Sequence, residues 1–506
     1  MGNHLITWMV TLPMLGAMLQ AFVPQFKGLK PSAIAKWSAL LSSSAASFIG
    51  ILLVLSMRGA TAEIQASESL SWVGSYAISY DMGVDGLNAL IILLIALVFP
   101  VLIAYEWDQK VAPRWMHGLF LILQTSFFGA ACAQDLFLLF FFWGLSSFPI
   151  YFLIGIWGGA ERETAAFRSM VANSLGDGLF FCALVLVYYA VDPHTFLIRE
   201  LGGGHLGAKN FILFGEELSV SKVAFGLIGL ALAFRGPIWP FQGWFTKVAA
   251  EAPASVFVVI SGITAPVALY IFIRLSYTLF PETLQMGAPI IVTIGVLNLV
   301  MGGVSAAAQR SLSGLLAFLC LSEVGMVLIG IGSMNPAGVV GAVYQVLALG
   351  LGVTGFGLIS GILFDRLGDG VFVNKEGETR FGGIAVRAPA IAVMAGMVIA
   401  SLLGFPGFGG FVSHALVTIG SYSTRPIIVA VAAFALLLAN YYVFMMYRHI
   451  FFGKPSAASQ DFEDLTWRER FYLFPIVVGL LFSGVYPRPL LDLVRPTVLT
   501  LLSVAK

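Results

Sequence analysis

The sequence predicts an all-α polytopic membrane protein. Of its 506 residues, 59% are apolar and only 10% are charged, whereas soluble domains have about 45–50% apolar and about 25% charged residues. The apolar residues run in stretches of about 20, the length that a bilayer-spanning helix needs. Helices are expected because lipid offers no partners for backbone polar groups. This composition excludes a soluble enzyme, a disordered chain and a secreted disulfide scaffold, and the net charge of +1 indicates no nucleic-acid partner.

About fourteen segments are long and apolar enough to be spans. They lie near residues 5–23, 34–57, 84–105, 116–132, 136–158, 169–191, 221–249, 254–279, 286–307, 311–331, 338–364, 388–421, 426–450 and 471–487. The first has no basic region before it and no A-x-A cleavage site after it, so we expect a retained span rather than a cleaved signal. No series of short alternating strands appears between the segments.

The basic residues predict the orientation. Of the 27 lysines and arginines, sixteen fall in loops after odd-numbered spans and six, including Arg274, in loops after even-numbered spans. Lysine and arginine gather in cytoplasmic loops. The sequence therefore predicts a multi-pass protein of the bacterial cytoplasmic membrane with both termini on the periplasmic side.

Two spans carry helix breakers in their middle. The seventh contains Gly236, Pro237 and Pro240, and the twelfth contains Pro406 and Gly407. Proline removes a backbone donor and clashes with the preceding turn, so both helices should unwind there. Unwound backbone at membrane depth is tolerated only beside protein or a wet cavity.

The breaks also indicate an internal repeat. Spans 4–8 and 9–13 are each five long, and the broken span is the fourth in both. Five is an odd number, so the second block enters from the opposite side, and paired broken helices of this kind point to an ion or substrate path. Packing kinks without transport are the alternative. We expect an N-terminal segment (1–115), a first repeat (116–279), a second, inverted repeat (286–450) and a C-terminal loop with the last helix (451–506).

Several motifs then resemble a known family. Together they resemble subunit M, or chain 4, of bacterial NADH:quinone oxidoreductase (complex I), an antiporter-like type. The motifs are Gly83-Val84-Asp85-Gly86-Leu87, Tyr151 through Gly159, Pro240-Phe241-Gln242-Gly243-Trp244, Gln309 through Gly330, Phe381-Gly382-Gly383 and Ala400 through Gly407. The resemblance implies a membrane-arm subunit with no redox cofactor, no metal and no direct NADH or quinone binding. Its partners would be the other membrane-arm subunits and the bilayer, and redox chemistry elsewhere would drive protons along its polar axis.

At most positions of the family's polar axis, the row of residues that would carry protons, this chain has a different residue. The family's fifth-span glutamate falls on Gly144, its seventh-span lysine on Arg235, and its eighth-span lysine on Pro266. The three family histidines fall on Gln242, Glu323 and Leu349, and the twelfth-span glutamate aligns with His414. Asp177, in the sixth span, resembles a feature of the longer subunit L type.

The remaining charged residues are the proton-path candidates, and none is assigned a catalytic role. A relay needs groups that titrate near the working pH, and arginine does not. Arg235 is therefore either a control charge or a remnant held in an ion pair. A mid-membrane charge costs about 2.5–3.5 kcal/mol on insertion scales, so we expect Asp177 or Glu323 to neutralise Arg235. Glu323 is a relay carboxylate or that counter-ion. His414 is a proton acceptor or bonds a backbone carbonyl.

Lys247 and Glu251 lie four residues apart at the cytoplasmic end of the seventh span. They are candidates for the path, but an i, i+4 ion pair on the helix face is the simpler expectation. Asp85 is expected to cap the third helix.

Three functions follow from these observations. The first is a proton-pumping subunit of an NADH:quinone oxidoreductase. The second is a scaffold subunit derived from a pump, which the axis replacements favour as a mechanism. The third is the membrane subunit of a related cation/proton antiporter, hydrogenase or carbon-uptake complex.

Overall fold

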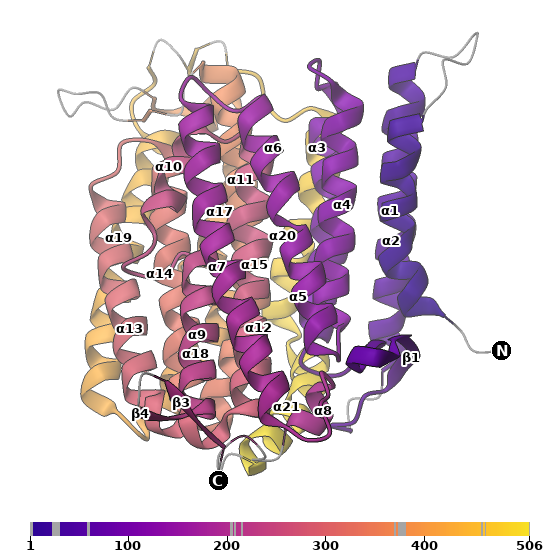
Figure 1. Cartoon of the computed structure of the whole chain (residues 1–506). Coiled ribbons are helices and arrows are strands. Elements are labelled where there is room, and N and C mark those ends of the chain that lie inside the picture. The colour runs from indigo at the N-terminus through magenta and orange to yellow at the C-terminus, as the bar shows by residue number, and fades with distance from the viewer. Residues whose placement is uncertain are drawn as a thin grey trace.

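Long apolar helices run side by side from one end of the molecule to the other (Figure 1). The computed structural model describes residues 4–22, 31–57, 61–202, 206, 209–213, 216–368, 371–372, 381–456, 459–460 and 462–504. Six basic residues counted for the orientation, Lys27, Lys30, Arg58, Lys375, Arg380 and Lys506, lie outside these described residues.

The first half of the chain contains an N-terminal segment and the predicted first repeat. Its helices are α1 (Leu5–Phe22), α2 (Pro31–Ser56), α3 (Ala89–Tyr105), α4 (Pro113–Cys132), α5 (Leu136–Leu145), α6 (Ser147–Trp157), α7 (Arg162–Ala190), α8 (Ile198–Leu201), α9 (Val220–Arg235), α10 (Gly243–Glu251), α11 (Ala254–Val259) and α12 (Ala265–Leu279). Short 3-10 turns η1 (Gly74–Tyr76) and η2 (Glu106–Asp108) accompany them, and a π-helical turn, η3 (Ile260–Thr264), joins α11 to α12.

The second half contains the predicted second repeat and the C-terminal helices. These are α13 (Pro281–Ala307), α14 (Leu312–Gly332), α15 (Pro336–Leu367), α16 (Ile384–Arg387), α17 (Pro389–Leu402), α18 (Gly409–Tyr422), α19 (Pro426–Phe452), α20 (Trp467–Val485) and α21 (Arg488–Val504). Among them, α14 and α15 are almost wholly buried, as is the span formed by α11 and α12, whereas α13 and α19 expose most of their length. The core therefore lies around α12, α14 and α15.

Helix length and apolarity do not confirm the count of fourteen spans. In the described part of the chain, eleven helices meet both criteria, or up to twelve if α20 and α21, bent by 70°, form one span. Every predicted segment is helical. The seventh and twelfth are divided into shorter helices, α9 with α10 and α17 with α18, and the fifth is interrupted between α5 and α6. The predicted breaks are thus confirmed. The two divided spans run in opposite directions through the bundle (Figure 1), as an inverted arrangement requires.

Two hairpins occur that the sequence analysis did not predict. β1 (Ala66–Val73) pairs antiparallel with β2 (Ile78–Val84), and β3 (Asn210–Leu213) pairs with β4 (Glu216–Ser219). Both lie at the same end of the bundle as α8 and α21 (Figure 1). They are connections at an end of the bundle, where strands can form without spanning lipid.

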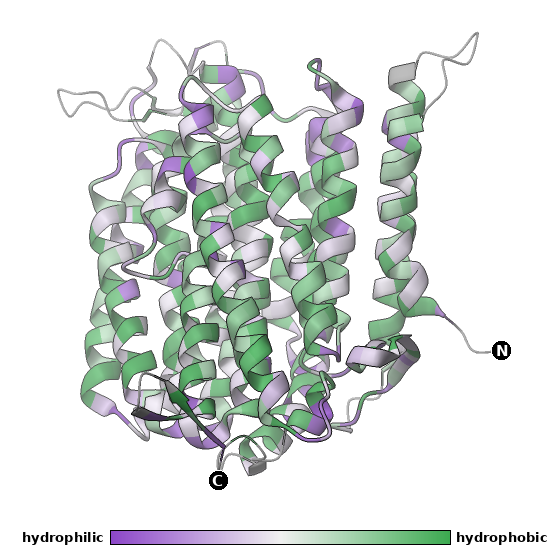
Figure 2. Ribbon diagram, in the orientation of Figure 1, coloured by the Kyte–Doolittle hydropathy of each residue, from purple (hydrophilic) through white to green (hydrophobic). Residues whose placement is uncertain are grey.

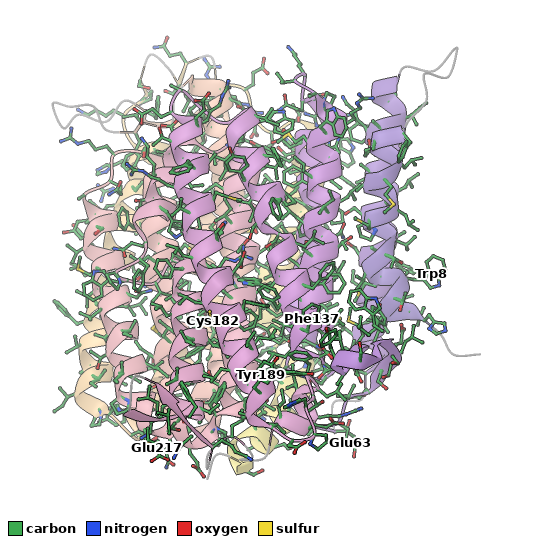
Figure 3. The ribbon with its side chains drawn as sticks, in the orientation of Figure 1. Trp8, Glu63, Phe137, Cys182, Tyr189 and Glu217 are labelled. Carbon is green, nitrogen blue, oxygen red and sulfur yellow. The ribbon has the colours of Figure 1, made fainter. Side chains whose placement is uncertain are left out.

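The hydropathy of the residues changes along the long axis of the helix bundle. Hydrophobic residues dominate the helices at mid-height and hydrophilic residues gather at both ends (Figure 2). Glu63 and Glu217 lie at the lower end, and Tyr189 lies above them (Figure 3). Tyr189 is 70% exposed, and exposed aromatic side chains at such a level are typical of the membrane–water interface.

Two buried polar sites at the helix breaks

Arg235 ends α9 inside the bundle and is paired with Asp177. It is 1% exposed, and its Nη2 atom lies 3.1 Å from Oδ1 of Asp177 on α7. Gly236 and Pro237 follow it and stop the helix, which places the guanidinium beside α7 and the α5–α6 junction. The expected neutralisation of Arg235 is therefore confirmed, with Asp177 and not Glu323 as the partner.

An interruption of the fifth span supplies further bonds to Arg235. α5 ends at Leu145 and α6 begins at Ser147. At this junction the carbonyl of Trp143 accepts from Arg235 Nη2 at 2.6 Å and also from the Ser146 hydroxyl at 2.7 Å. Arg235 Nη1 donates to Ser146 Oγ at 3.3 Å, and the guanidinium lies 4.2 Å from the centre of the Trp143 ring. These contacts hold a permanent charge in one orientation.

Asp177 bonds α6 as well as Arg235. Its second oxygen, Oδ2, accepts from Ser147 Oγ at 2.8 Å, so the aspartate bridges α6 and α9 from α7. A β-carbon at Gly144, where the resemblance places the family's glutamate, would meet no atom within 4 Å. The first site thus keeps an acid next to its cation but takes the acid from a different helix.

Asn298, which the sequence analysis did not single out, holds the first break. Its Oδ1 accepts from the Trp239 backbone N–H at 2.7 Å, and its Nδ2 donates to the Pro237 carbonyl at 3.1 Å. The same Nδ2 reaches the carbonyl of Leu321 on α14 at 3.4 Å. An asparagine in an otherwise apolar span was the available signal, since a buried amide needs partners.

The second site is a buried pair of titratable groups. Glu323 on α14 and His414 on α18 are 4% and 7% exposed, and their Oε2 and Nε2 atoms are 2.9 Å apart. His414 therefore bonds a carboxylate and not the backbone carbonyl that was the alternative. Glu323 is the partner of His414 and not the counter-ion of Arg235.

Gln345 and Ser413 extend this pair into a chain of four. Gln345 on α15 donates through Nε2 to Glu323 Oε2 and accepts through Oε1 from Ser413 Oγ. Gln345 lies one helical turn before Leu349, the position where the resemblance places the family's eleventh-span histidine, and provides a neutral polar group there. Gln345 was not among the predicted site residues because the resemblance points to Leu349 and not to its neighbours on the helix.

The second break shapes the wall behind His414. Gly404 and Gly407 adopt φ of +67° and +96°, values that favour glycine. The break is held by Asn440 on α19, whose Nδ2 donates to the Leu403 carbonyl at 2.8 Å. Each break is therefore bonded by an asparagine from another helix, Asn298 for the first and Asn440 for the second.

Lys247 and Glu251 do not form the expected pair. Lys247 is paired with Glu161, which precedes α7, and Glu251 Oε2 accepts from the Glu161 backbone N–H at 2.9 Å. The hydrogen bond and the charge of Lys247 lower the pKa of Glu161. The i, i+4 expectation was wrong because both side chains turn from their own helix toward the α6–α7 connection.

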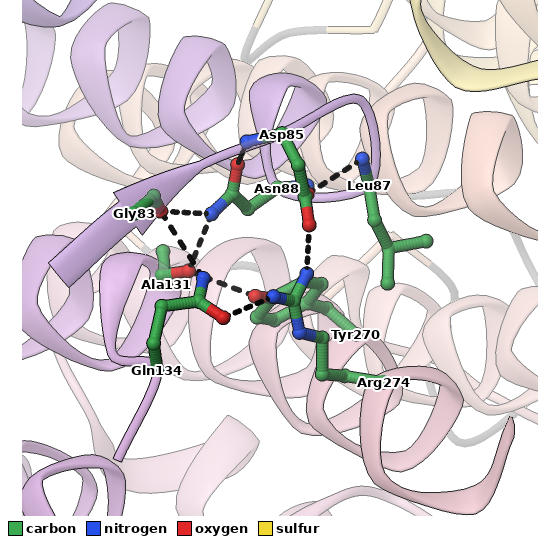
Figure 4. Close-up of polar contacts among 8 residues, drawn as sticks. All are labelled: Gly83, Asp85, Leu87, Asn88, Ala131, Gln134, Tyr270 and Arg274. Atoms are coloured by element: carbon green, nitrogen blue, oxygen red, sulfur yellow. Dashed lines mark hydrogen bonds and ion pairs between the residues drawn. The ribbon is translucent and has the colours of Figure 1, made fainter. Parts of the chain in front are cut away.

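A third buried ion pair joins Arg274 to Asp85, and here the sequence analysis was also wrong. It counted Arg274 as a loop residue, but Arg274 lies within α12 and is buried against Asp85 and Gln134. Asp85 Oδ1 accepts from the backbone N–H groups of Leu87 and Asn88 just before α3, so it does support the start of that helix. Figure 4 shows the Asp85 carboxylate between the backbone at the start of α3 and the guanidinium of Arg274.

Comparisons with known proteins agree with this arrangement. Residues 133–439 match the family model described as "NADH:quinone oxidoreductase/Mrp antiporter, TM". NADH-quinone oxidoreductase subunit M of Mycobacterium tuberculosis (strain H37Rv) is 27% identical, with 97% of this chain and 92% of that protein covered. The same subunit of Escherichia coli (strain K12) is 28% identical, with 96% of each chain covered.

Solved structures share the fold. A chain of respiratory complex I from Thermus thermophilus superposes with a TM-score of 0.86 at 22% identity, covering 99% of this chain and 100% of that one. A chain of the Mrp complex from Dietzia sp. DQ12-45-1b gives 0.85 at 19% identity, covering 98% and 97%. Because the family model spans more than half of the sequence, including both breaks and both buried sites, this chain belongs to the family of NADH:quinone oxidoreductase/Mrp antiporter membrane subunits.

Proposed function

We propose that this protein is an antiporter-like membrane-arm subunit of an NADH:quinone oxidoreductase type complex and that it takes part in redox-driven proton translocation. Its relatives of nearly equal length carry the name subunit M of that enzyme. The redox reaction then belongs to other subunits, and this chain holds no redox cofactor and binds neither NADH nor quinone. The other membrane-arm subunits are its partners.

The Glu323–His414 pair is the observation that carries the proton role. One is a carboxyl group and the other an imidazole, both are buried, and they are within hydrogen-bond distance of each other. A proton can pass between a carboxylate and an imidazole when the two pKa values are brought together. Gln345 and Ser413 orient the acceptor oxygens without exchanging charge.

Arg235 has a different role in this proposal. Its guanidinium stays protonated, so the Arg235–Asp177 pair is a fixed dipole and not a relay. Asn298 bonds the break beside Arg235 and the backbone of Leu321, two residues before Glu323. A shift of the first break would therefore be transmitted to α14 and change the position of the Glu323 carboxylate.

The proposal is tested by proton-to-electron stoichiometry of the purified complex in liposomes. Glu323→Gln keeps the size of the side chain and removes its titration, so fewer protons should be moved per electron while NADH oxidation continues. Glu282→Gln, at an exposed glutamate in the first turn of α13, is the matched control and should leave the ratio unchanged. An unchanged ratio in Glu323→Gln would reject the relay role.

We further infer that both termini face the periplasm of a bacterial cytoplasmic membrane. The start of α1 and helix α21 lie at one end of the bundle, and the α3–α4 and α6–α7 connections lie at the other (Figure 1). The α3–α4 and α6–α7 connections and the helix starts that follow them carry Lys110, Arg114 and Arg162, the bias expected for the cytoplasmic side. A cysteine at Ser67 in β1 should react with an impermeant thiol reagent from the periplasm, and one at Lys110 should not.

A further inference from the structure

An apolar groove lies between α9, α12 and α13, outside the polar sites. It encloses about 600 Å³ and its walls include Phe225, Phe272 and Ile290. One end is closed by the first break, from Gly236 to Phe241. Ile290 is 65% exposed, so the groove opens at the outer surface of the helix bundle.

The other end of the groove is polar. Lys222, in the first turn of α9, and Thr283, in the first turn of α13, line it. Thr283 Oγ1 lies 2.6 Å from Ser221 Oγ. Within the described residues, no acidic side chain forms an ion pair with Lys222. The two hydroxyl groups bond each other, so the ammonium group of Lys222 is the group at this end that an anion can pair with.

The groove is long enough to span the hydrocarbon core of one leaflet. Fourteen residues of helix separate Lys222 from Gly236, which corresponds to about 21 Å of rise. One leaflet of the hydrocarbon core is about 15 Å deep. An acyl chain that begins beside Lys222 at the membrane surface would therefore reach the break near the middle of the membrane.

We propose that this groove binds an acyl chain of an anionic phospholipid, with the headgroup phosphate at Lys222. The apolar walls supply van der Waals contact, which drives association where no water is displaced, and the lysine supplies preference for negative charge. This site goes beyond the proton role and does not depend on it.

Two glycines keep the groove open. A β-carbon at Gly226 would meet nothing within 4 Å, and one at Gly229 would meet only Phe272 at 3.7 Å. A leucine at Gly226 therefore fits the protein and occupies the space of the acyl chain. Gly178 on α7 also has no neighbour within 4 Å and does not line the groove, so Gly178→Leu is the matched control.

The test is native mass spectrometry of the detergent-purified complex after incubation with phosphatidylglycerol or phosphatidylcholine. The wild type and Gly178→Leu should retain phosphatidylglycerol, and Gly226→Leu should lose it. Ile290→Trp is a second filling variant in case Gly226→Leu does not assemble. Lys222→Gln should lose the preference for phosphatidylglycerol over phosphatidylcholine, whereas Lys209→Gln, at the β3 end of the same connection, should keep it.

Three outcomes would overturn the proposal. One is retention of the same lipid by Gly226→Leu and Ile290→Trp. Another is no lipid on the wild type together with loss of a neighbouring subunit in the filling variants, which would make the groove a protein interface. The third is an unchanged lipid preference in Lys222→Gln.

Discussion

Gly404 lies directly against the ring of His414: a β-carbon at this glycine would stand 2.6 Å from Nδ1 of the histidine. The break of the second divided helix therefore sets the position of a titratable group. Glycine is required at position 404 for two reasons: the backbone has a positive φ, and the His414 ring occupies the space that a β-carbon would need.

Gly404→Ala should displace His414 and lower proton translocation. The left-handed backbone alone costs about 1–3 kcal/mol for a residue other than glycine. Gly407→Ala carries the same kind of cost, since φ is +96°, but has no neighbour within 4 Å. Both variants should lower the thermal unfolding midpoint, and only Gly404→Ala should lower the proton-to-electron ratio. Equal ratios in the two variants would contradict a role for the contact with His414.

Moving the carboxylate from α7 back to α5 should preserve the first site. Asp177→Asn leaves the buried Arg235 without its acid, and breaking a buried pair costs about 3–5 kcal/mol. The double variant Asp177→Asn with Gly144→Glu should recover assembly, because the space at Gly144 is open. Asp177→Asn with Gly144→Gln is the control of equal size. Quantitative immunoblots of the assembled complex measure the recovery, and equal recovery by both double variants would show that charge is not what matters.

The Asp85–Arg274 pair in Figure 4 should behave as one unit. Asp85→Asn leaves a buried arginine and should destabilise by about 3–5 kcal/mol. Adding Arg274→Gln removes the unpaired charge and should restore much of the loss. Thermal unfolding of the two single variants and the double variant measures this coupling, and additive losses would contradict it.

Asp464 should make stability depend on pH. Burial raises the pKa of its carboxyl, but backbone N–H groups of Ala390, Leu465 and Ile391, and the charge of Arg470, outweigh burial and lower it. A lowered folded-state pKa means that the stabilisation is present above the unfolded value of about 3.9 and is lost as pH falls through the folded value.

Asp464→Asn should therefore destabilise the start of α17 at neutral pH by about 1 kcal/mol, because the bonds from the Ala390 and Ile391 N–H groups would go to a neutral amide oxygen and not to a charged carboxylate. The difference from the wild type should close as the pH falls through the folded-state pKa. Unfolding midpoints measured across pH give the comparison. Asp108→Asn, at an exposed ion pair with Arg468, is the control and should change little.

The sequence could predict features that depend on local chemistry. Proline next to glycine breaks a helix wherever it occurs, so both breaks were predictable, as was the need of Arg235 for an acid. The choice of Asp177 over Glu323 was not, because it depends on which faces of α7 and α14 turn toward α9. Arg274 was misplaced because it lies near the end of an apolar run, where sequence cannot separate a loop from a buried turn.

Neutral residues were the hardest to find. Asn298 and Gln345 carry no charge. Asn298 bonds backbone groups freed by the first break, and Gln345 bonds the side chains of Glu323 and Ser413 on other helices. The partner of Lys247 was missed for a related reason, since Glu161 is distant in sequence and approaches only because the α6–α7 connection folds back onto α10.

The asparagines that hold the two breaks sit on helices that touch each other. A β-carbon at Gly303 of α13 would lie 3.1 Å from that of Ala439, the residue before Asn440 on α19, and Asn298 lies on α13 itself. The two breaks are therefore connected through uncharged residues on the packed helices α13 and α19. We expect a displacement at one discontinuity to reach the other along this route, which requires no ionisable group.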